Sequence, residues 1–302
     1  MWAITSYYNP ARFKRRLQNY RIFRENLVVP LVAVELSFDG HFELTEKDAD
    51  VLIQISGGAV LWQKERLLNI ALGSVPPDVD HIAWIDCDVI FDRSDWVNEA
   101  NKQLDEFNVV QLLSDQVDLR PQDHHTNFDY QGLPPSGRGI VTMVRENESA
   151  GLPVPGQNRR SFAWGLAWAA RRQILEDHGF YDAMIGGGGT RAMVTAIDGE
   201  FEQIADAFQL SGARQEHYLK WARPYHQAVG KRIGYVDGRL YHLWHGDIRN
   251  RNYASRHQGL VDFNFELDDL VIGPNGAWQW ARSKPGLENY LMNHFINRAE
   301  DG

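Results

Sequence analysis

Residues 82–88 read Ile-Ala-Trp-Ile-Asp-Cys-Asp, a short apolar run that ends in two carboxylates. Four consecutive apolar residues between polar segments predict a buried strand. Side chains two positions apart in an extended chain point the same way, so Asp86 and Asp88 can leave the strand end together. Two oxygen ligands on one side suit a hard divalent cation. By itself an Asp-x-Asp pair is equally consistent with a polar strand end, so the surrounding pattern matters.

The sequence before this stretch alternates predicted strands with predicted helices. In chain order we expect a strand at 2–8, a helix after Asn9-Pro10, strands at 31–38 and 51–55, and a helix at 61–72. This alternation is typical of an α/β fold with a mixed, mostly parallel sheet flanked by helices. Ligands of such sheets bind beyond the carboxyl ends of the strands, where Asp86 and Asp88 fall.

After residue 92 the pattern is less regular. Residues 114–160 are rich in proline and glycine, which predicts a long loop region that could shape a substrate cleft. The elements expected beyond it are a strand at 162–170, a helix at 171–178, a glycine loop at 186–189, a helix at 191–209 and a strand at 234–243. We find no linker that would separate independent domains.

Composition excludes several classes of protein. Among the 302 residues, 43% are hydrophobic and 24% charged, values of a globular protein and not of a disordered or coiled-coil chain. The net charge of −9 argues against a protein that simply coats nucleic acid. Cys87 is the single cysteine, which excludes an intrachain disulfide and a multi-thiolate zinc site. With no secretory signal or apolar span in the sequence, we expect a cytoplasmic protein.

A second polar motif, His-Leu-Trp-His-Gly-Asp at 242–247, follows the last predicted strand. An imidazole added to two carboxylates makes a mixed site that suits manganese better than calcium. The alternative is a core histidine bonded to the backbone. Downstream, Arg249, Arg251 and Arg256 could close over a diphosphate by charge-assisted hydrogen bonds, or form a solvated surface.

Taken together, these motifs resemble glycosyltransferases of the GT-A fold, especially family 2-like enzymes of a subgroup common in bacteria, phages and large viruses. The stretches that carry the resemblance are 3–10, 61–69, 82–91, 162–182 with the glycine run, 242–256 and 293–302. The resemblance implies a single GT-A domain over 1–302, with a nucleotide-binding half at 1–92, an acceptor half at 93–245 and a C-terminal closing segment at 246–302.

The resemblance also implies that a nucleotide-diphosphate sugar is the donor and that a divalent metal, Mn²⁺ before Mg²⁺, is the cofactor. The metal ligands would be Asp86, Asp88 and His245. The residues expected around the nucleotide are Thr5, Tyr7, Glu35, Lys64, Asn69, Asp86, Arg249 and Arg251. For Lys64 a plain surface pair with Glu65 is the alternative.

On the acceptor side the resemblance implies Trp164, Trp168 and the glycine loop, with Gly187 and Gly188. Glycines let the backbone approach a sugar closely, and a tryptophan face can stack on a pyranose. Core packing is the alternative for both tryptophans. The acceptor hydroxyl could belong to a glycan, a protein, a small metabolite or a modified base of phage DNA.

One residue departs from the family pattern. Inverting relatives end the glycine loop with an acid that serves as general base, but this chain has Thr190 there, and a threonine hydroxyl is no base at neutral pH. Either another acid serves, for which Asp182 is the candidate, or the enzyme retains configuration, or activity is reduced. Asp182 could equally be a turn or cap residue next to Gly179.

Two other functions are consistent with the sequence. Thr190 would suit a nucleotide-sugar or glycan-binding relative that has lost catalysis. A metallohydrolase could use Asp123, His124 and His125 with His217 or His226, although these residues lie in loop-like sequence without the ligand spacing of a helix or strand.

Overall fold

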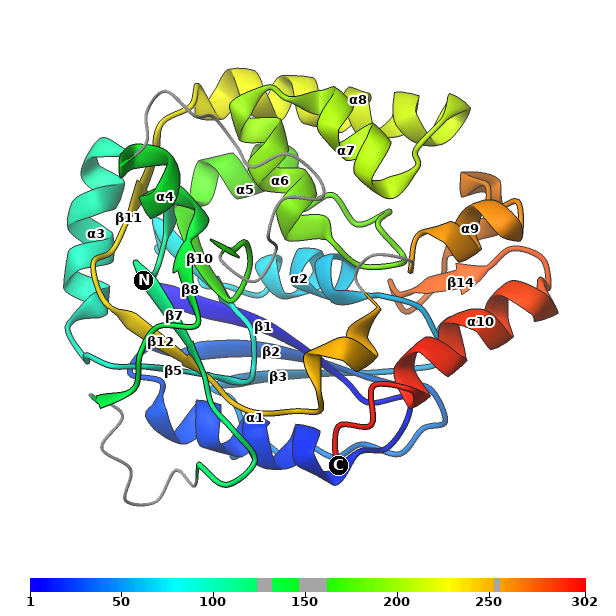
Figure 1. Ribbon diagram of the computed structural model, residues 1–302, viewed down its shortest axis with the longest axis horizontal. Helices are drawn as coiled ribbons and strands as arrows, with labels where there is room; N and C mark the ends of the chain where they lie inside the picture. The colour runs from blue at the N-terminus through cyan, green and yellow to red at the C-terminus, as the bar shows by residue number, and fades with distance from the viewer. Residues whose placement is uncertain (124–131, 147–161, 253–255) are drawn as a thin grey trace.

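The computed structural model describes residues 1–123, 132–146, 162–252 and 256–302. A seven-stranded sheet forms its centre (Figure 1). In spatial order the strands are β11 (Ile233–Tyr235), β6 (Val109–Gln111), β10 (Ala167–Arg171), β4 (His81–Ile85), β1 (Trp2–Tyr8), β2 (Leu31–Ser37) and β3 (Val51–Ser56). Only β10 runs antiparallel to its neighbours β4 and β6, and the other pairs are parallel. The predicted class, a mostly parallel α/β sheet flanked by helices, is confirmed.

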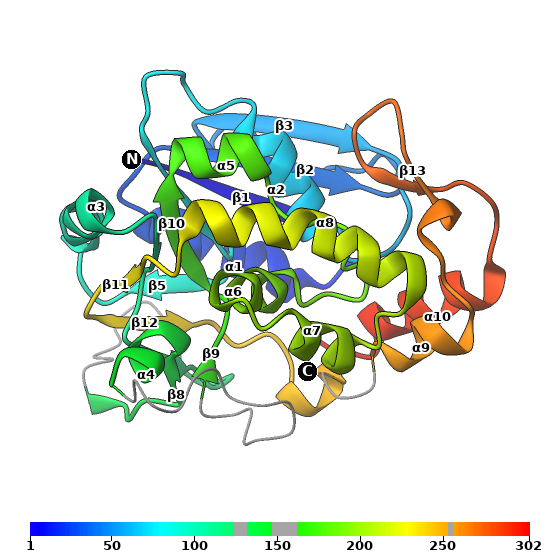
Figure 2. The ribbon, with the colours of Figure 1, turned by 90° about the horizontal axis from the view of Figure 1, so that it is seen from above.

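Helices cover both faces of this sheet (Figures 1 and 2). One face packs against α1 (Lys14–Asn26) and α3 (Trp96–Glu106), and the other against α2 (Lys64–Leu72), α5 (Arg172–His178), α6 (Gly189–Asp198) and α8 (Gly212–Val229). A further helix, α7 (Phe201–Phe208), lies between α6 and α8 in the chain. Side chains of β1 alternate between the faces, since Ala3 and Tyr7 pack with Tyr20 of α1 while Ile4 and Tyr8 pack with the cluster of α2.

A second sheet of five strands lies beside the first. Its order is β5 (Val89–Phe91), β12 (Arg239–His242), β7 (Asp115–Asp118), β8 (Gly137–Gly139) and β9 (Phe162–Ala163), with α4 (Ile140–Glu146) after β8. β5 follows Asp88 and pairs antiparallel with β12, so that His242 lies opposite Val89. This pairing brings the two polar motifs of the sequence together, although more than 150 residues separate them in the chain.

The C-terminal part wraps around one end of the molecule and returns to α1. It contains η3 (Ile248–Arg251), α9 (Gln258–Asp262), η4 (Leu267–Asp269), the hairpin β13 (Leu270–Ile272) and β14 (Trp278–Trp280), and α10 (Pro285–Ile296). The two oxygens of the Asp301 carboxylate accept hydrogen bonds from the backbone N–H groups of Lys14 and Arg15 at the start of α1. A residue near the C-terminus therefore caps α1, a helix near the N-terminus.

Several predicted elements have different limits in the structure. The strand expected at 162–170 is interrupted, because Leu166 has a φ of +76° and separates β9 from β10. The strand expected at 234–243 divides into β11 and β12, which belong to different sheets. The helix expected at 191–209 is α6 and α7, divided at Gly199, which has a φ of +85°.

Both helix starts in the N-terminal part were also predicted too early. The second begins at Lys64, not at residue 61. The first begins at Lys14, so Asn9 is no N-cap; its side-chain oxygen instead accepts a hydrogen bond from the Phe13 backbone N–H, which closes the turn before the helix. In the part of the chain that the structure describes, no helix combines the length and apolar character that crossing a membrane requires.

Candidate functional site

A cleft of about 1150 Å³ opens beyond the carboxyl ends of β1 and β4. Strand order reverses between these two strands, because β2 and β3 lie on one side of β1 and β4 on the other. Such a reversal is where open α/β sheets bind ligands. The walls of the cleft come from β1, residues 86–88, the start of α6 and residues 242–251, together with Trp62 and Arg298.

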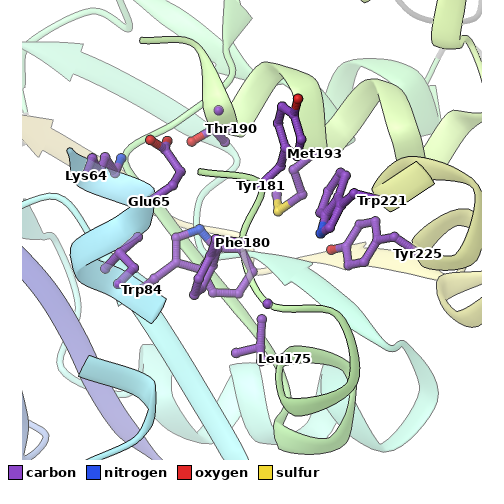
Figure 3. A pocket seen from close by; sticks show the side chains of 13 residues that line it. Lys64, Glu65, Trp84, Leu175, Phe180, Tyr181, Thr190, Met193, Trp221 and Tyr225 are labelled. Carbon is purple, nitrogen blue, oxygen red and sulfur yellow. The ribbon is translucent and has the colours of Figure 1, made fainter. Parts of the chain in front are cut away.

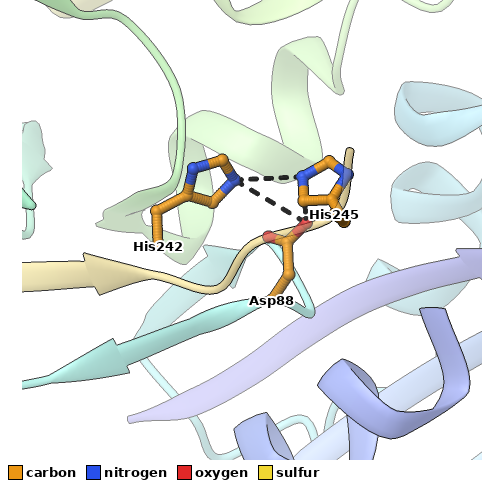
Figure 4. Close-up of side chains that lie close together, drawn as sticks. All are labelled: Asp88, His242 and His245. Carbon is orange, nitrogen blue, oxygen red and sulfur yellow. Dashed lines mark hydrogen bonds and ion pairs between the residues drawn. The ribbon is translucent and has the colours of Figure 1, made fainter. Parts of the chain in front are cut away.

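Among the residues that line this cleft, Asp88, His242 and His245 converge (Figure 4). The Nε2 atoms of the two histidines are 3.1 Å apart, and the Asp88 Oδ2 atom lies 3.1 Å from His245 Nε2 and 3.9 Å from His242 Nε2. Ligands bonded at roughly 2.1 Å to one ion are separated by roughly 3.0–3.4 Å at right or tetrahedral angles. These three atoms therefore have nearly the spacing of ligands around a single metal ion.

The atoms behind the three ligands also fit a metal. His242 Nδ1 is 2.9 Å from the Asp118 carboxylate, and His245 Nδ1 is 3.5 Å from that of Glu300. A carboxylate behind each ring favours the tautomer in which Nε2 carries the lone pair that a cation would bind. The other oxygen of Asp88, Oδ1, is buried without a hydrogen-bond partner among the described residues. A buried carboxylate oxygen in that position is satisfied by a cation.

The protonation states agree with this interpretation. Burial by itself would raise the pKa of Asp88, but His245, His242 and Arg251 outweigh it and hold that pKa well below its usual range. Burial, aided by the charge of Arg251, lowers the pKa of His245. Arg251 Nη2 also lies 3.0 Å from His245 Nε2, so this arginine would have to move away before a metal could bind that nitrogen. A carboxylate beside a neutral imidazole is the form that binds a metal.

The side chains that converge differ in one member from the predicted metal ligands. We expected Asp86, Asp88 and His245; in the structure His242 lies beside Asp88 and His245, and the carboxylate of Asp86 pairs with Lys64. The reason is the pairing of β5 with β12, which turns His242 toward Asp88. Burial by itself would lower the pKa of Lys64, but Asp86 and Glu65 raise it, so this lysine stays charged at the cleft.

The residues predicted around the nucleotide divide into two groups. Thr5 and Lys64 line the cleft, and the Thr5 hydroxyl donates to the Ile85 carbonyl, which joins β1 to β4. Tyr7 and Glu35 do not line it. The Tyr7 hydroxyl donates to Glu43, and the Glu35 carboxylate accepts from the backbone of Glu43; both lie at a separate cavity of about 100 Å³.

Packing against α1 explains the position of Tyr7. Thr5, Ser6 and Tyr8 of β1 line the cleft, whereas Tyr7 packs with Tyr20 of α1. For Tyr7 and Glu35 the predicted contact with base and ribose is therefore not supported by the geometry, and Tyr8 takes a position in the cleft that we had not assigned.

Asn69 and Asp182 serve the loop before α6 and do not line the cleft. Asp182 Oδ2 accepts from Arg66 at 3.1 Å and from Asn69 at 3.2 Å. Asn69 also exchanges two hydrogen bonds with the backbone of Phe180, at 2.8 and 2.9 Å. Both side chains thus tie this loop to α2, and the geometry does not favour the predicted roles of Asp182 as base and Asn69 at the nucleotide.

Arginines dominate the charge of the cleft walls. The predicted Arg249, Arg251 and Arg256 line it, and so do Arg16, Arg191 and Arg298, which the sequence had not assigned. Arg16 lies within a basic run that is typical of a solvated helix face. In the structure it is mostly buried and binds the Glu300 carboxylate, because the C-terminal segment covers it.

The two tryptophans of the predicted acceptor side have different roles. Trp164 lines the cleft, with the Arg191 guanidinium 5.1 Å above its ring. Trp168 is 1% exposed and stacks on Trp84 in the core, so the geometry contradicts its predicted contact with an acceptor. Gly188 lines the cleft with a φ of +100°, which favours glycine, and Gly187 lies against Arg256 and Trp62.

Among the described residues, those proposed for a metallohydrolase do not lie together. His124 and His125 lie outside the described residues. His217 is paired with the Tyr181 hydroxyl at 3.0 Å, and His226 faces the backbone carbonyl of Ile197 at 3.0 Å. Asp123 pairs with its neighbour Arg120. Within the described ranges these groups stabilise local structure.

No protein-family model matches the sequence, and a search of curated proteins finds no match. Solved structures similar to this chain include residues 1–349 of TarS from S. aureus, with 13% identity, a TM-score of 0.39, and coverage of 98% of this chain and 70% of that one. Mouse xyloside xylosyltransferase 1 is 10% identical, with a TM-score of 0.34 and coverage of 78% and 84%. The catalytic domain of Drosophila β1,4-galactosyltransferase 7 is 12% identical, with a TM-score of 0.30 and coverage of 78% and 63%.

Proposed function

We propose that this protein is a divalent-metal-dependent glycosyltransferase, which moves a sugar from a nucleoside-diphosphate sugar to an acceptor hydroxyl. The observation that carries the proposal is the group of Asp88, His242 and His245 in an arginine-lined cleft, at the strand reversal between β1 and β4. A metal held there would neutralise the negative charge that develops on the departing diphosphate. Its mixed oxygen and nitrogen ligands suit Mn²⁺ better than Ca²⁺.

The side chains around the metal group have complementary tasks in this proposal. Lys64, Arg251 and Arg298 supply positive charge to the cleft and would hold the diphosphate oxygens by charge-assisted hydrogen bonds. Tyr8 and Trp62, whose ring centroids are 6.2 Å apart, offer an aromatic wall on which a nucleobase can stack. We place the nucleotide in residues 1–92, the acceptor in 93–245 and a closing segment in 246–302.

A metal-depletion experiment tests the proposal. The protein is incubated with UDP-glucose, UDP-galactose, UDP-N-acetylglucosamine and GDP-mannose, and release of nucleoside diphosphate is measured with Mn²⁺, after excess EDTA, and after Mn²⁺ is restored. We expect EDTA to lower release from the preferred donor by a factor on the order of 10² or more, and Mn²⁺ to restore it. Release that is unaffected by EDTA would contradict a metal-dependent transferase.

Thr190, which lines the cleft, favours one second candidate, a nucleotide-sugar-binding protein without catalysis. The same samples distinguish the two functions. Binding of a sugar nucleotide that requires Mn²⁺, measured by calorimetry, together with no release from that donor, would support the binding protein. Binding together with metal-dependent release would support the transferase.

A further inference from the structure

Five carboxylates line the cleft in the described part of the chain: Glu65, Asp86, Asp88, Asp118 and Asp247. Four of them have partners. Asp86 binds Lys64, Asp88 belongs to the metal group, Asp118 bonds His242, and Asp247 caps η3 and pairs with Arg249. Among the described ion pairs none includes Glu65, the second residue of α2. Of these five carboxylates, that of Glu65 is therefore the candidate for a role in proton transfer.

Glu65 is directed at the glycine loop (Figure 3). A Cβ at Gly189 would overlap the Glu65 carboxylate, so that glycine leaves the space that the acid fills. Glu65 and Thr190 also share the wall of a small enclosed pocket of about 10 Å³ beside the main cleft. Glu65 of α2 thus places a carboxylate next to Thr190, the position at which the loop itself has only a hydroxyl.

The surroundings of Glu65 suit a group that takes up and gives up a proton near neutral pH. Glu65 is 6% exposed, and this burial raises its pKa to about 7. Lys64 on the same helix lowers that pKa, while Asp86 after β4 and Asp182 before α6 raise it. Tyr8 of β1 also interacts with Glu65. A general base is most effective when its pKa lies near the working pH.

We propose that Glu65 is the general base of the reaction, in the place of the acid that the glycine loop lacks at Thr190. This inference rests on the proposed transferase function. The acceptor O–H proton passes to the Glu65 carboxylate as the acceptor oxygen attacks the anomeric carbon. The bond from that carbon to the diphosphate oxygen breaks, and its electron pair leaves with the nucleoside diphosphate. Attack from the face opposite the leaving group inverts the anomeric configuration.

Glu65→Gln tests the assignment, because it keeps the shape of the side chain and removes the base. With water as acceptor and the preferred donor, we expect the rate of the wild type to rise as pH increases through 7. We expect the variant to lose this rise, and to lose a factor on the order of 10²–10⁴ in kcat at pH 8. Glu176→Gln, at an exposed position of α5, is the matched control and should behave as the wild type.

Two further variants separate a base from a structural residue. Glu65→Gln/Thr190→Asp returns a carboxylate to the loop and should recover at least ten-fold in kcat. Glu65→Asp keeps the carboxylate and should retain more activity than Glu65→Gln. This difference separates loss of the base from a loss of stability that both substitutions share. Binding of UDP with Mn²⁺, followed by calorimetry, should change less than three-fold in all variants, because the loss concerns the chemical step.

The outcomes distinguish this inference from the proposed function. Metal-dependent release by the wild type, with more than a tenth of that rate in Glu65→Gln, overturns the base assignment and leaves the transferase intact. The same holds if Asp182→Asn, and not Glu65→Gln, removes the pH dependence, or if NMR of the released sugar shows retained configuration. A wild type that releases no nucleotide from any donor in the presence of Mn²⁺ overturns both.

Discussion

Asp88→Ala is expected to lower metal-dependent release of nucleoside diphosphate by a factor on the order of 10²–10³, comparable with removal of a principal charge-stabilising group from an active site. In the proposed metal site Asp88 would provide the single oxygen ligand and the single negative charge among the three ligands. The measurement is initial release with saturating donor over a series of Mn²⁺ concentrations. Titration of the protein with Mn²⁺ alone should show at least a ten-fold weaker metal affinity.

Asp95→Ala is the matched control for this variant. Asp95 follows the same motif by a few residues but is exposed and pairs with Arg93, so its loss should leave both metal affinity and release unchanged. If the Asp88→Ala protein is folded, as judged by circular dichroism, and binds Mn²⁺ as tightly as the wild type, Asp88 is not a metal ligand.

Glu300→Gln is expected to lower the free energy of unfolding by about 3–5 kcal/mol, the range for breaking a buried ion pair from one side. Glu300 is 1% exposed, and its carboxylate receives Arg16 at 2.6 and 2.9 Å and Arg298 at 2.6 Å. An amide would leave two arginines largely buried without their counter-charge. The same change removes the negative charge behind His245 Nδ1, so Mn²⁺ affinity should also fall by roughly ten- to a hundred-fold.

The pH dependence gives this prediction a second test. Burial by itself would raise the pKa of Glu300, but Arg16, His245 and Arg298 hold it well below its usual range. A carboxylate whose pKa is lower in the folded state stabilises the protein above its unfolded pKa of about 4.3, and this contribution is lost as pH falls through the folded value. Urea unfolding at pH 7 and at decreasing pH below 4 should therefore show the difference between wild type and Glu300→Gln shrinking.

Glu46→Gln provides the comparison, since Glu46 is exposed on a loop and should change stability by less than about 0.5 kcal/mol. If Glu300→Gln unfolds at the same urea concentration as the wild type at pH 7, the C-terminal segment is not held by this ion-pair network.

Local patterns predicted most of the scaffold. The apolar run that ends at Ile85 is a strand, and the alternation of elements before it forms the parallel part of the sheet. These features are readable because burial imposes a period on each element separately, without reference to distant residues. Element limits were less accurate where a single backbone angle decides them, as at Leu166 and Gly199.

The residues of the site were only partly predictable, because contacts between distant segments decide which side chains meet. Asp88 and His245 were predicted as metal ligands, and the pairing of β5 with β12 places His242 beside them. Packing against α1 keeps Tyr7 out of the cleft, and Trp168 packs in the core against Trp84. None of these outcomes is a property of a short segment.

What the sequence by itself determined is the order of strands and helices and the two polar motifs at the strand ends, because periodicity and strand-end position are local. Only the tertiary structure decided which charges meet. It buried Arg16 against Glu300 from the other end of the chain, and it directed Glu65 of α2 at the glycine loop. Both follow from long-range packing, since a charge that loses its water must find a partner or change its pKa wherever the fold places it.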